Sequence, residues 1–405
     1  MNAICLVIDR LHVGHIGAYG NAWAETPSFD ALACESFVFD QALTTGSRIE
    51  TLYQNLWQGR HPLLVESDQA PAADLARRLA VSGVATTLLT DTSTVADHPG
   101  AASFDNLVEF DPLERIEPAD EVEQTHLARC FAQLIDRLGS AEGPFLFWAH
   151  LSSMDTCWDA PYAFRERFAE PGDPAPPRSA EAPRVALPKD YDPDVLLGMV
   201  QSYAGQVSLL DVCLGALLES IDEGPLAEDT LLAVFSARGF PLGEHDHVGP
   251  GEESLHGELV HVPMMVRLPK GLGAAQRSQA LVTPADLRAT LLEWWSVDNP
   301  LASSMDKSLL PIIRGDVAAV RDRLVLGQPD LEKAVRTPAW YMRLTDPPHL
   351  YVKPDDRWEV NNVADRCESV VEELQEIVDD FQTCLDSDRI DDMKPISDVL
   401  RDGLE

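Results

Sequence analysis

Three largely apolar runs constrain the fold of this chain more than any other sequence feature. They cover residues 3–8, 145–150 and 230–236. Apolar side chains on both faces of a strand are typical of parallel strands that helices cover on either side. The first run ends directly before Asp9, and ligand sites of open α/β sheets lie at such carboxyl ends of strands. The runs therefore predict an α/β protein with a functional group near Asp9.

Helix and strand patterns alternate between and beyond these runs. A helix is predicted after the capping pair Thr26-Pro27, and the remaining predicted elements are helices 121–139, 194–222 and 285–294 and strands 84–89 and 261–267. After Gly315 the pattern changes to short strands, 324–327, 335–344 and 349–353, closed by a helix over 366–385. We expect an α/β domain over residues 1–315 and an α+β subdomain over 316–405. The Pro-rich residues 168–193 predict a surface excursion.

The charge of the chain excludes several classes of partner. Its 405 residues include 31 Lys or Arg and 67 Asp or Glu, which gives a formal net charge of −36. Such a field repels nucleic acids and anionic membrane surfaces, so we expect neither as a partner. No apolar run approaches the ~20 residues of a membrane span, and the first residues lack the basic start of a signal peptide. Seven scattered Cys favour reduced thiols and a cytoplasmic location.

Four segments, taken in chain order, carry motifs of a known family. They are LVIDRLHVGHIGAYGN with the following ETPSFDALA, LLAVFSARGFPLGEH, HVPMMVRLPKG, and LYVKPDDRWEVNNVAD. Together they resemble the sulfatase family of the alkaline-phosphatase superfamily. The resemblance implies a central, mostly parallel sheet flanked by helices, with a small C-terminal α+β subdomain. It also implies sulfuric ester hydrolysis, which needs a nucleophile, a divalent metal ion, cations that stabilise negative charge, and an acid for the leaving group.

The nucleophile position that the resemblance implies is changed. Residues 42–62 align without a gap to the family segment that carries a Cys or Ser matured to formylglycine, and this alignment places Ile49 at the nucleophile. An aliphatic side chain can neither attack an ester nor be oxidised to an aldehyde. A gapped alignment places Thr44 there instead. If the protein is an active hydrolase, Ser47 and Thr51 are the other candidate nucleophiles.

The metal positions that the resemblance implies are changed as well. Asp9 matches the first carboxylate, but Arg10 follows it, and Ala237 and Arg238 occupy the two positions after the later strand. One carboxylate and two fixed cations make a poor site for Ca²⁺ or Mg²⁺, which take several oxygen ligands. We therefore expect Asp9 to pair with Arg10 or Arg238. No cofactor is expected, and Ca²⁺ or Mg²⁺ is expected only if the protein is active.

The remaining family positions have lost their cations and their acid. Asp91 lies where the family has a Lys, Cys157 lies where it has a His, and Glu252 lies at a second Lys position. Carboxylates at the Lys positions reverse the field that a sulfate or phosphate group would need. Cys157 is a nucleophile only if His150 activates it. A buried thiol is the simpler interpretation.

One loop contains other possible metal ligands. His245 and His247 flank Asp246 and together offer ligands for Zn²⁺ or Ni²⁺. The alternative interpretation is a solvated loop that retains only the family's Glu-His pair.

The sequence thus supports one main hypothesis and one alternative. The main hypothesis is a sulfatase-family protein with a degenerate site that serves as a scaffold or binds an anion. Its partners would be a small anion, held by Arg10 or Arg238, or another protein. The alternative is an active, divalent-metal-dependent sulfuric or phosphoric ester hydrolase with a Thr or Ser nucleophile. The sequence does not indicate an oligomeric state.

Overall fold

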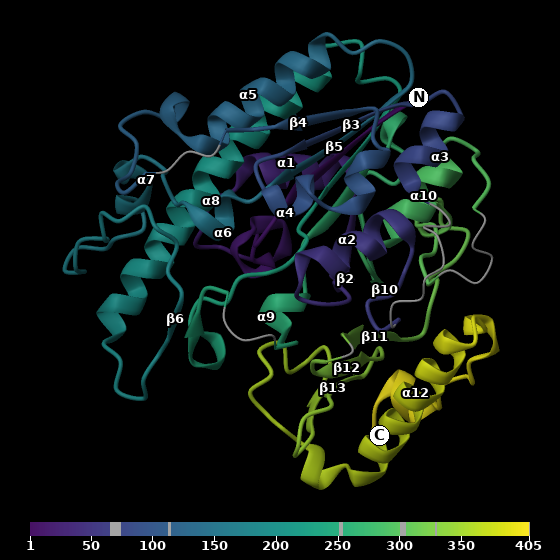
Figure 1. Cartoon of the computed structure of the whole chain (residues 1–405). Coiled ribbons are helices and arrows are strands. Elements are labelled where there is room, and N and C mark those ends of the chain that lie inside the picture. Colours follow the sequence, from purple (N-terminus) through teal and green to yellow (C-terminus); the bar gives the residue numbers. More distant parts are fainter. Residues whose placement is uncertain (65–73, 112–114, 251–253, 300–304, 329, 405) are drawn as a thin grey trace. The chain divides into compact units, whose positions relative to one another are not determined.

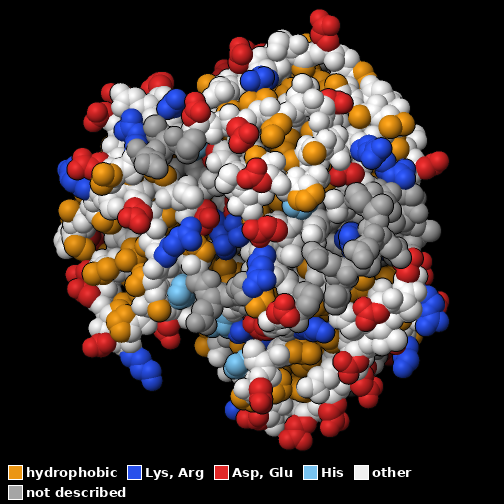
Figure 2. Space-filling model, viewed as in Figure 1, with side chains coloured by type: hydrophobic (Ala, Val, Ile, Leu, Met, Phe, Trp, Pro, Cys, Tyr) orange, Lys and Arg blue, Asp and Glu red, His pale blue; other side chains and the backbone are white. Residues whose placement is uncertain are grey.

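The described part of the chain forms two compact units. A computed structural model describes residues 1–64, 74–111, 115–250, 254–299, 305–328 and 330–404. The first unit comprises residues 1–40, 83–252 and 262–278, and the second comprises residues 41–82, 253–261 and 279–405. Acidic side chains are spread over the visible surface (Figure 2), in keeping with the net charge of −36.

An eight-stranded sheet forms the framework within the described residues. Its strand order is β10-β2-β9-β7-β1-β5-β3-β4. β1 pairs in parallel with β5 and β7, β3 pairs in parallel with β4 and β5, and β9 runs antiparallel to β2 and β7. The predicted, mostly parallel α/β sheet is therefore present. The strands are β1 (Asn2–Ile8), β2 (Phe37–Ala42), β3 (Ala85–Thr90), β4 (Asn106–Glu109), β5 (Phe145–Leu151), β7 (Thr230–Phe235), β9 (Met264–Arg267) and β10 (Gln276–Val282).

Helices of the first unit bury its apolar sheet residues. α5 (His126–Gly139) and α8 (Pro193–Asp222) lie side by side, and α1 (Pro27–Glu35) also packs on α8 (Figure 1). The predicted helix 121–139 starts later than expected, because Thr125 caps it and accepts a hydrogen bond from the Ala128 amide. The shorter helices of this unit are α4 (Ser93–Ala96), α6 (Ser153–Thr156) and α7 (Tyr162–Glu166).

α8 is the core helix of the first unit. Asp192 caps its first turn and Pro193 occupies the first position, where a missing N–H costs nothing. By length and composition it would be able to cross a membrane, so the expectation that no segment reaches that apolarity was wrong. However, 72% of its most apolar window is buried inside the protein. That burial is typical of a core helix in a globular domain.

The segment that was expected to be a surface excursion is partly folded. Ala180 and Ala182 are buried, and β6 (Val185–Ala186) pairs antiparallel with β8 (His247–Val248). The buried guanidinium of Arg165 donates to the carbonyl oxygens of Pro177 and Ser179. Backbone groups of a Pro-rich segment thus find partners in spite of the missing N–H donors.

A four-stranded antiparallel sheet and a long helix form the core of the second unit. The strands are β11 (Leu324–Gly327), β12 (Lys333–Arg336), β13 (Trp340–Arg343) and β14 (His349–Val352), and their apolar side chains pack with α12 (Glu368–Asp386). The single strand predicted over 335–344 was wrong. Pro338 has no N–H for a ladder, and Thr337 closes a turn by bonding Trp340, so the segment divides into β12 and β13. The remaining helices of this unit are α2 (Ile49–Gln58), α3 (Leu75–Val81), α9 (Gly257–Val260), α10 (Asp286–Trp294), α11 (Leu310–Ile313) and α13 (Asp398–Asp402).

Candidate functional site at the ends of β1 and β7

Asp9 and Arg238 lie at the same edge of the large sheet. β1 and β7 are neighbouring parallel strands, with Val7 opposite Phe235, so the residues that follow each strand emerge together. Leu11 and the Ser236 hydroxyl link the two segments, because the Leu11 amide donates to Ser236 Oγ at 3.2 Å. This is the edge where an α/β sheet presents its ligand site.

A buried ion pair occupies this edge, as the sequence predicted. Arg238 Nε donates to Asp9 Oδ1 at 3.1 Å, and Arg238 Nη2 donates to Asp9 Oδ2. Asp9 is 2% exposed and the Arg238 side chain 12%. Burial alone would raise the pKa of the Asp9 carboxyl, but the charge and hydrogen bonds of Arg238 outweigh it and lower the pKa to about 2. The carboxylate is therefore ionised and both of its oxygens are engaged.

Arg10 places a second guanidinium beside this pair. Its Nη1 donates to the Gly239 carbonyl at 3.2 Å, and its Nε lies 3.6 Å from Asp155 Oδ1. The exposed Arg184 donates from Nη2 to the same oxygen at 3.3 Å. Burial, followed by the charge of Arg238, lowers the pKa of Arg10 to about 10, so Arg10 remains a cation at neutral pH. Asp155 occupies the Asp position of the family motif that places Cys157 at its His, but no role was predicted for Asp155 or for Arg184.

Tyr203 of α8 holds the loop that carries Arg10. Arg10 has a φ of 66°, a left-handed conformation that costs a non-glycine residue energy. The Tyr203 hydroxyl donates to the Arg10 carbonyl at 2.8 Å and accepts from the His12 amide at 2.7 Å. These bonds fix the strained backbone and therefore the direction of the Arg10 side chain.

A second group of polar residues surrounds His12. His12 Nε2 lies 3.3 Å from Glu244 Oε1, and Glu244 Oε2 accepts from the Leu242 amide at 2.5 Å. Burial would raise the pKa of Glu244, but the His12 contact and this hydrogen bond lower it to about 2. Burial lowers the pKa of the neighbouring His15 to about 3, which keeps that imidazole neutral.

The loop predicted as a zinc or nickel site is a short turn that leads into β8. His245 is exposed, with a φ of 50°, whereas His247 begins β8 and pairs with Ala186. Among the residues that the structure describes, His247 belongs to no group of three converging metal-ligand atoms. The solvated-loop interpretation therefore fits His247 better than the metal interpretation does.

Asp91 lies in a different cluster at the end of β3. Both of its oxygens accept from the Ser152 amide, at 2.9 and 3.1 Å, and Oδ2 lies 3.0 Å from His126 Nε2. The Cys130 thiol lies 3.5 Å from the same nitrogen. His126 and Cys130 were not predicted as site residues, although their spacing of four residues on an amphipathic helix was a readable signal.

Three of the other residues that the sequence pointed to, Ala237, Cys157 and His150, are buried. Ala237 is 1% exposed and precedes Arg238 without offering a ligand atom. Burial raises the pKa of the Cys157 thiol to about 12, opposite to what a nucleophilic thiolate requires. Burial also lowers the pKa of His150. Glu252 lies outside the described residues.

The nucleophile segment belongs to the second unit. Ile49 is the first residue of α2 and is 7% exposed. Thr44 is 2% exposed, and its amide donates to the Val260 carbonyl at 2.8 Å. Thr51 donates from Oγ1 to the Arg48 carbonyl at 3.0 Å and accepts from Gln328 at 3.1 Å, while Ser47 is half-buried. The hydroxyl of Thr51 is thus engaged in holding the first turn of α2.

The residues at the ends of β1 and β7 do not fit the divalent ion that a sulfatase fold implies. The Asp9 oxygens that would bind the ion receive the Arg238 guanidinium instead. Arg10 and Arg238 are cations, and Ala237 has no ligand atom. A divalent ion would therefore meet two positive charges and one already neutralised carboxylate.

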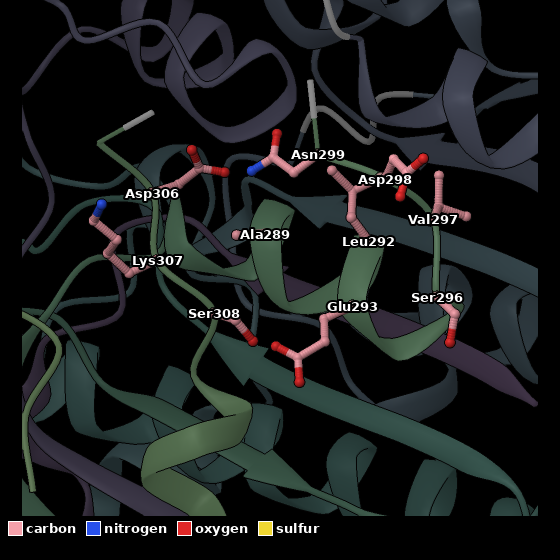
Figure 3. Close-up of a pocket in the computed structure, with 10 residues that line it drawn as sticks. All are labelled: Ala289, Leu292, Glu293, Ser296, Val297, Asp298, Asn299, Asp306, Lys307 and Ser308. Carbon is pink, nitrogen blue, oxygen red and sulfur yellow. The ribbon is translucent and has the colours of Figure 1, made fainter. Parts of the chain in front are cut away.

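A pocket in the second unit lies outside these predictions. It encloses about 520 Å³ and is lined by residues of α10 and by residues 296–299 and 306–308 (Figure 3). The buried guanidinium of Arg288 donates to Asn299 at 3.3 Å and to Asp306 at 2.9 Å. These lining groups thus have a structural role, and no predicted site residue lines the pocket.

A family model matches most of the chain. The sulfatase family model matches residues 1–297. The chain belongs to the sulfatase family. The predicted membership is therefore confirmed, and the chain has a sulfatase-family hydrolase scaffold.

Curated relatives match this chain over a short region. The chain is 28% identical over 116 residues to the multifunctional alkaline phosphatase superfamily protein PehA of Trinickia caryophylli, which is 28% of this chain and 22% of PehA. It is 32% identical over 126 residues to human iduronate 2-sulfatase, which is 28% of this chain and 21% of that protein. The matched regions thus span about a fifth of each relative's length.

Solved structures match over nearly the whole chain, at low identity. The phosphonate monoester hydrolase of Agrobacterium radiobacter has a TM-score of 0.75 at 16% identity, covering 96% of both chains. BT4656, solved in complex with its substrate D-glucosamine-2-N,6-O-disulfate, has a TM-score of 0.77 at 16% identity, covering 97% of this chain and 99% of BT4656. At these identities the likeness establishes the fold.

Proposed function

We propose that this sulfatase-family protein is a non-hydrolytic scaffold that binds small anions. The observation that carries the proposal is the two-point contact between Arg238 and Asp9, in which a guanidinium takes the oxygens that would bind a metal ion. The aliphatic Ile49 at the aligned nucleophile position supports it further. Without a metal ion and an attacking group, the scaffold lacks two of the four parts that ester hydrolysis needs.

The charge balance at this edge favours an anion. Three guanidinium groups, those of Arg10, Arg184 and Arg238, meet two carboxylates, those of Asp9 and Asp155, which leaves one positive charge in excess. Guanidinium groups bind sulfate, phosphate and carboxylate through paired N–H donors. Arg184 is 55% exposed, so it can contact an anion from solvent. The proposed ligand is therefore a small oxyanion or an anionic group on a protein partner.

Sensitive hydrolysis assays test the absence of catalysis. Purified protein should not cleave aryl sulfates, phosphates or phosphonates above the blank, with or without added Ca²⁺, Mg²⁺ or Mn²⁺. Turnover that disappears in Asp9→Asn would overturn the proposal and favour the alternative, a metal-dependent hydrolase with a Thr or Ser nucleophile. Thr44→Ala, Ser47→Ala and Thr51→Val would then identify that nucleophile.

A sulfate titration tests anion binding. Sulfate should raise the thermal unfolding midpoint of the wild-type protein relative to chloride at equal ionic strength, because a ligand of the folded state stabilises it. Arg184→Gln should raise the sulfate concentration that is needed for the same increase in the midpoint about 10-fold. Arg178→Gln is the matched control, since Arg178 is an exposed arginine of the same segment that lies over the Tyr162 ring. Equal responses in both variants would contradict an anion site at Arg184.

Restoring family residues tests why the metal is excluded. Arg10→Asp, Ala237→Asp and Arg238→Asn, combined in one variant, put oxygen ligands beside Asp9 and remove both cations. This variant should bind one Ca²⁺ per chain in a calorimetric titration, whereas the wild-type protein should bind none at this edge. It should remain inactive toward sulfate esters because Ile49 is unchanged.

We also propose that this protein works in the cytoplasm. All seven Cys residues are free thiols, which suits a reducing cytoplasm. The charge of −36 argues against nucleic acid or anionic membranes as partners.

A further inference from the structure

Three potential metal ligands converge in the first unit, at the end of β3. They are a carboxylate oxygen of Asp91, the Nε2 atom of His126 and the Sγ atom of Cys130, all within 4.8 Å of one another. The Asp91 oxygen lies 3.0 Å from His126 Nε2, and Cys130 Sγ lies 3.5 Å from it. None of the three belongs to the ion-pair site at the ends of β1 and β7.

Rigid elements hold the three side chains in place. Asp91 directly follows β3, while His126 and Cys130 are four residues apart on α5 and therefore share a helix face. Asp91 Oδ1 accepts from the Ser152 amide at 2.9 Å and from the Thr92 hydroxyl at 3.1 Å. These bonds fix the carboxylate so that Oδ2 faces the imidazole. Partners of this kind orient the ligands of metal sites in proteins.

The hydrogen bond between His126 and Asp91 leaves the Cys130 thiol without a proton acceptor on the same ring nitrogen. Asp91 and Cys130 both contact the same ring nitrogen, His126 Nε2. When Nε2 carries a proton it can donate to Asp91, but it then has no lone pair for the thiol proton. A nucleophilic Cys-His-Asp triad would use the two ring nitrogens separately. One cation at the point of convergence satisfies all three groups at once.

We propose that Asp91, His126 and Cys130 form a site for a zinc-like transition-metal ion. Carboxylate oxygen, imidazole nitrogen and thiolate sulfur are each ligands that zinc takes in proteins. Bond lengths of about 2.0–2.3 Å place neighbouring ligand atoms of a tetrahedral ion roughly 3.3–3.6 Å apart, close to the observed 3.0 and 3.5 Å. The fourth position would hold water. The site is independent of the proposed anion-binding function.

A cobalt titration tests the site. Cobalt(II) replaces zinc in such donor sets, and its bond to a thiolate gives a charge-transfer absorption band. Wild-type protein, stripped with a chelator and kept reduced, should develop this band up to one Co²⁺ per chain. Equimolar Zn²⁺ should then abolish it. A folded wild-type protein that develops no such band would overturn the proposal.

Single substitutions identify the ligands. Cys130→Ser should abolish the band, and Asp91→Asn and His126→Gln should each weaken Co²⁺ binding at least about 10-fold. Cys213→Ser and Cys34→Ser should leave the band unchanged, since these thiols, one buried and one exposed, lie outside the cluster. A band that persists in Cys130→Ser or disappears in Cys34→Ser would refute the assignment.

Two further measurements separate the site from the rest of the protein. Asp9→Asn should bind Co²⁺ as the wild type does, so failure of the anion proposal would leave this result unchanged. Zn²⁺ should raise the thermal unfolding midpoint of the wild type but not of Cys130→Ser. Cys130→Ser must show its own cooperative unfolding transition for this comparison, because that transition establishes that the variant is folded.

Discussion

Arg238 donates a hydrogen bond to each oxygen of Asp9, so the carboxylate that follows β1 is neutralised by the segment that follows β7. The pair is buried, and removing one member leaves the other charge without compensation. Such changes typically cost about 3–5 kcal/mol.

The first prediction concerns the coupling of this pair. Asp9→Asn and Arg238→Gln should each lower the free energy of unfolding by about 3 kcal/mol, and the double variant should lose less than the sum of the two. Urea unfolding of the four proteins gives the coupling energy. Additive losses would mean that the two side chains stabilise the protein separately.

The second prediction concerns acid stability below about pH 4. The pKa of Asp9 is about 2 in the folded protein and 3.8 when unperturbed. Because the folded-state pKa is depressed, the stabilisation is present above the unfolded value and is lost as the pH falls through about 4 toward 2. Asp9→Asn should lack this component. Parallel unfolding curves of the two proteins across that range would contradict the prediction.

The third prediction concerns His15 in a milder pH range. Burial lowers its folded-state pKa from 6.5 to about 3, so the unfolded chain binds a proton that the folded protein excludes. Stability should therefore fall as the pH drops below about 6.5, by up to about 1.4 kcal/mol per pH unit from this residue. His15→Gln should show a shallower decline than the wild type. Burial also lowers the pKa of His61, to about 4, and that contribution remains in both proteins.

The fourth prediction concerns Gly249, beside β8. Its φ is +83°, and a Cβ there would lie 1.9 Å from the Pro183 carbonyl oxygen. Gly83 has a φ of +84° with nothing within 4 Å of an added Cβ, so it is a matched control. Gly83→Ala should cost about 1 kcal/mol, and Gly249→Ala should cost about 3 kcal/mol or more, because backbone must move. If the two variants lost the same free energy of unfolding, the backbone around β6 and β8 would adjust to the added Cβ without a large cost.

The large sheet was predictable because its central strands are apolar on both faces. The strand ending at Asp9 and the strand of residues 230–236 were both read from such runs, and their neighbouring ends follow from parallel pairing. β2 and β10 were missed because they mix apolar with polar residues, including Asp40 and Gln276. Patterns of this kind do not distinguish a strand from a loop.

The candidate site was predictable only where it matched family motifs. Asp9, Arg10 and Arg238 were found because each replaces or retains a motif residue. The contact of Asp155 with Arg10 and the role of Tyr203 were not predicted, because they depend on how α8 and the segment after β5 pack against the β1 loop. Contacts between residues so distant in sequence leave no local signal in a single chain.

The Asp9–Arg238 pair also changes what this protein requires from its surroundings. A site of this fold that relied on a divalent ion at this position would be complete only where the ion is supplied, and chelators would empty it. In this chain the cation that balances Asp9 is the side chain of Arg238, which is part of the protein itself. Under the proposed function, this edge of the sheet therefore assembles without a supply of free metal ions.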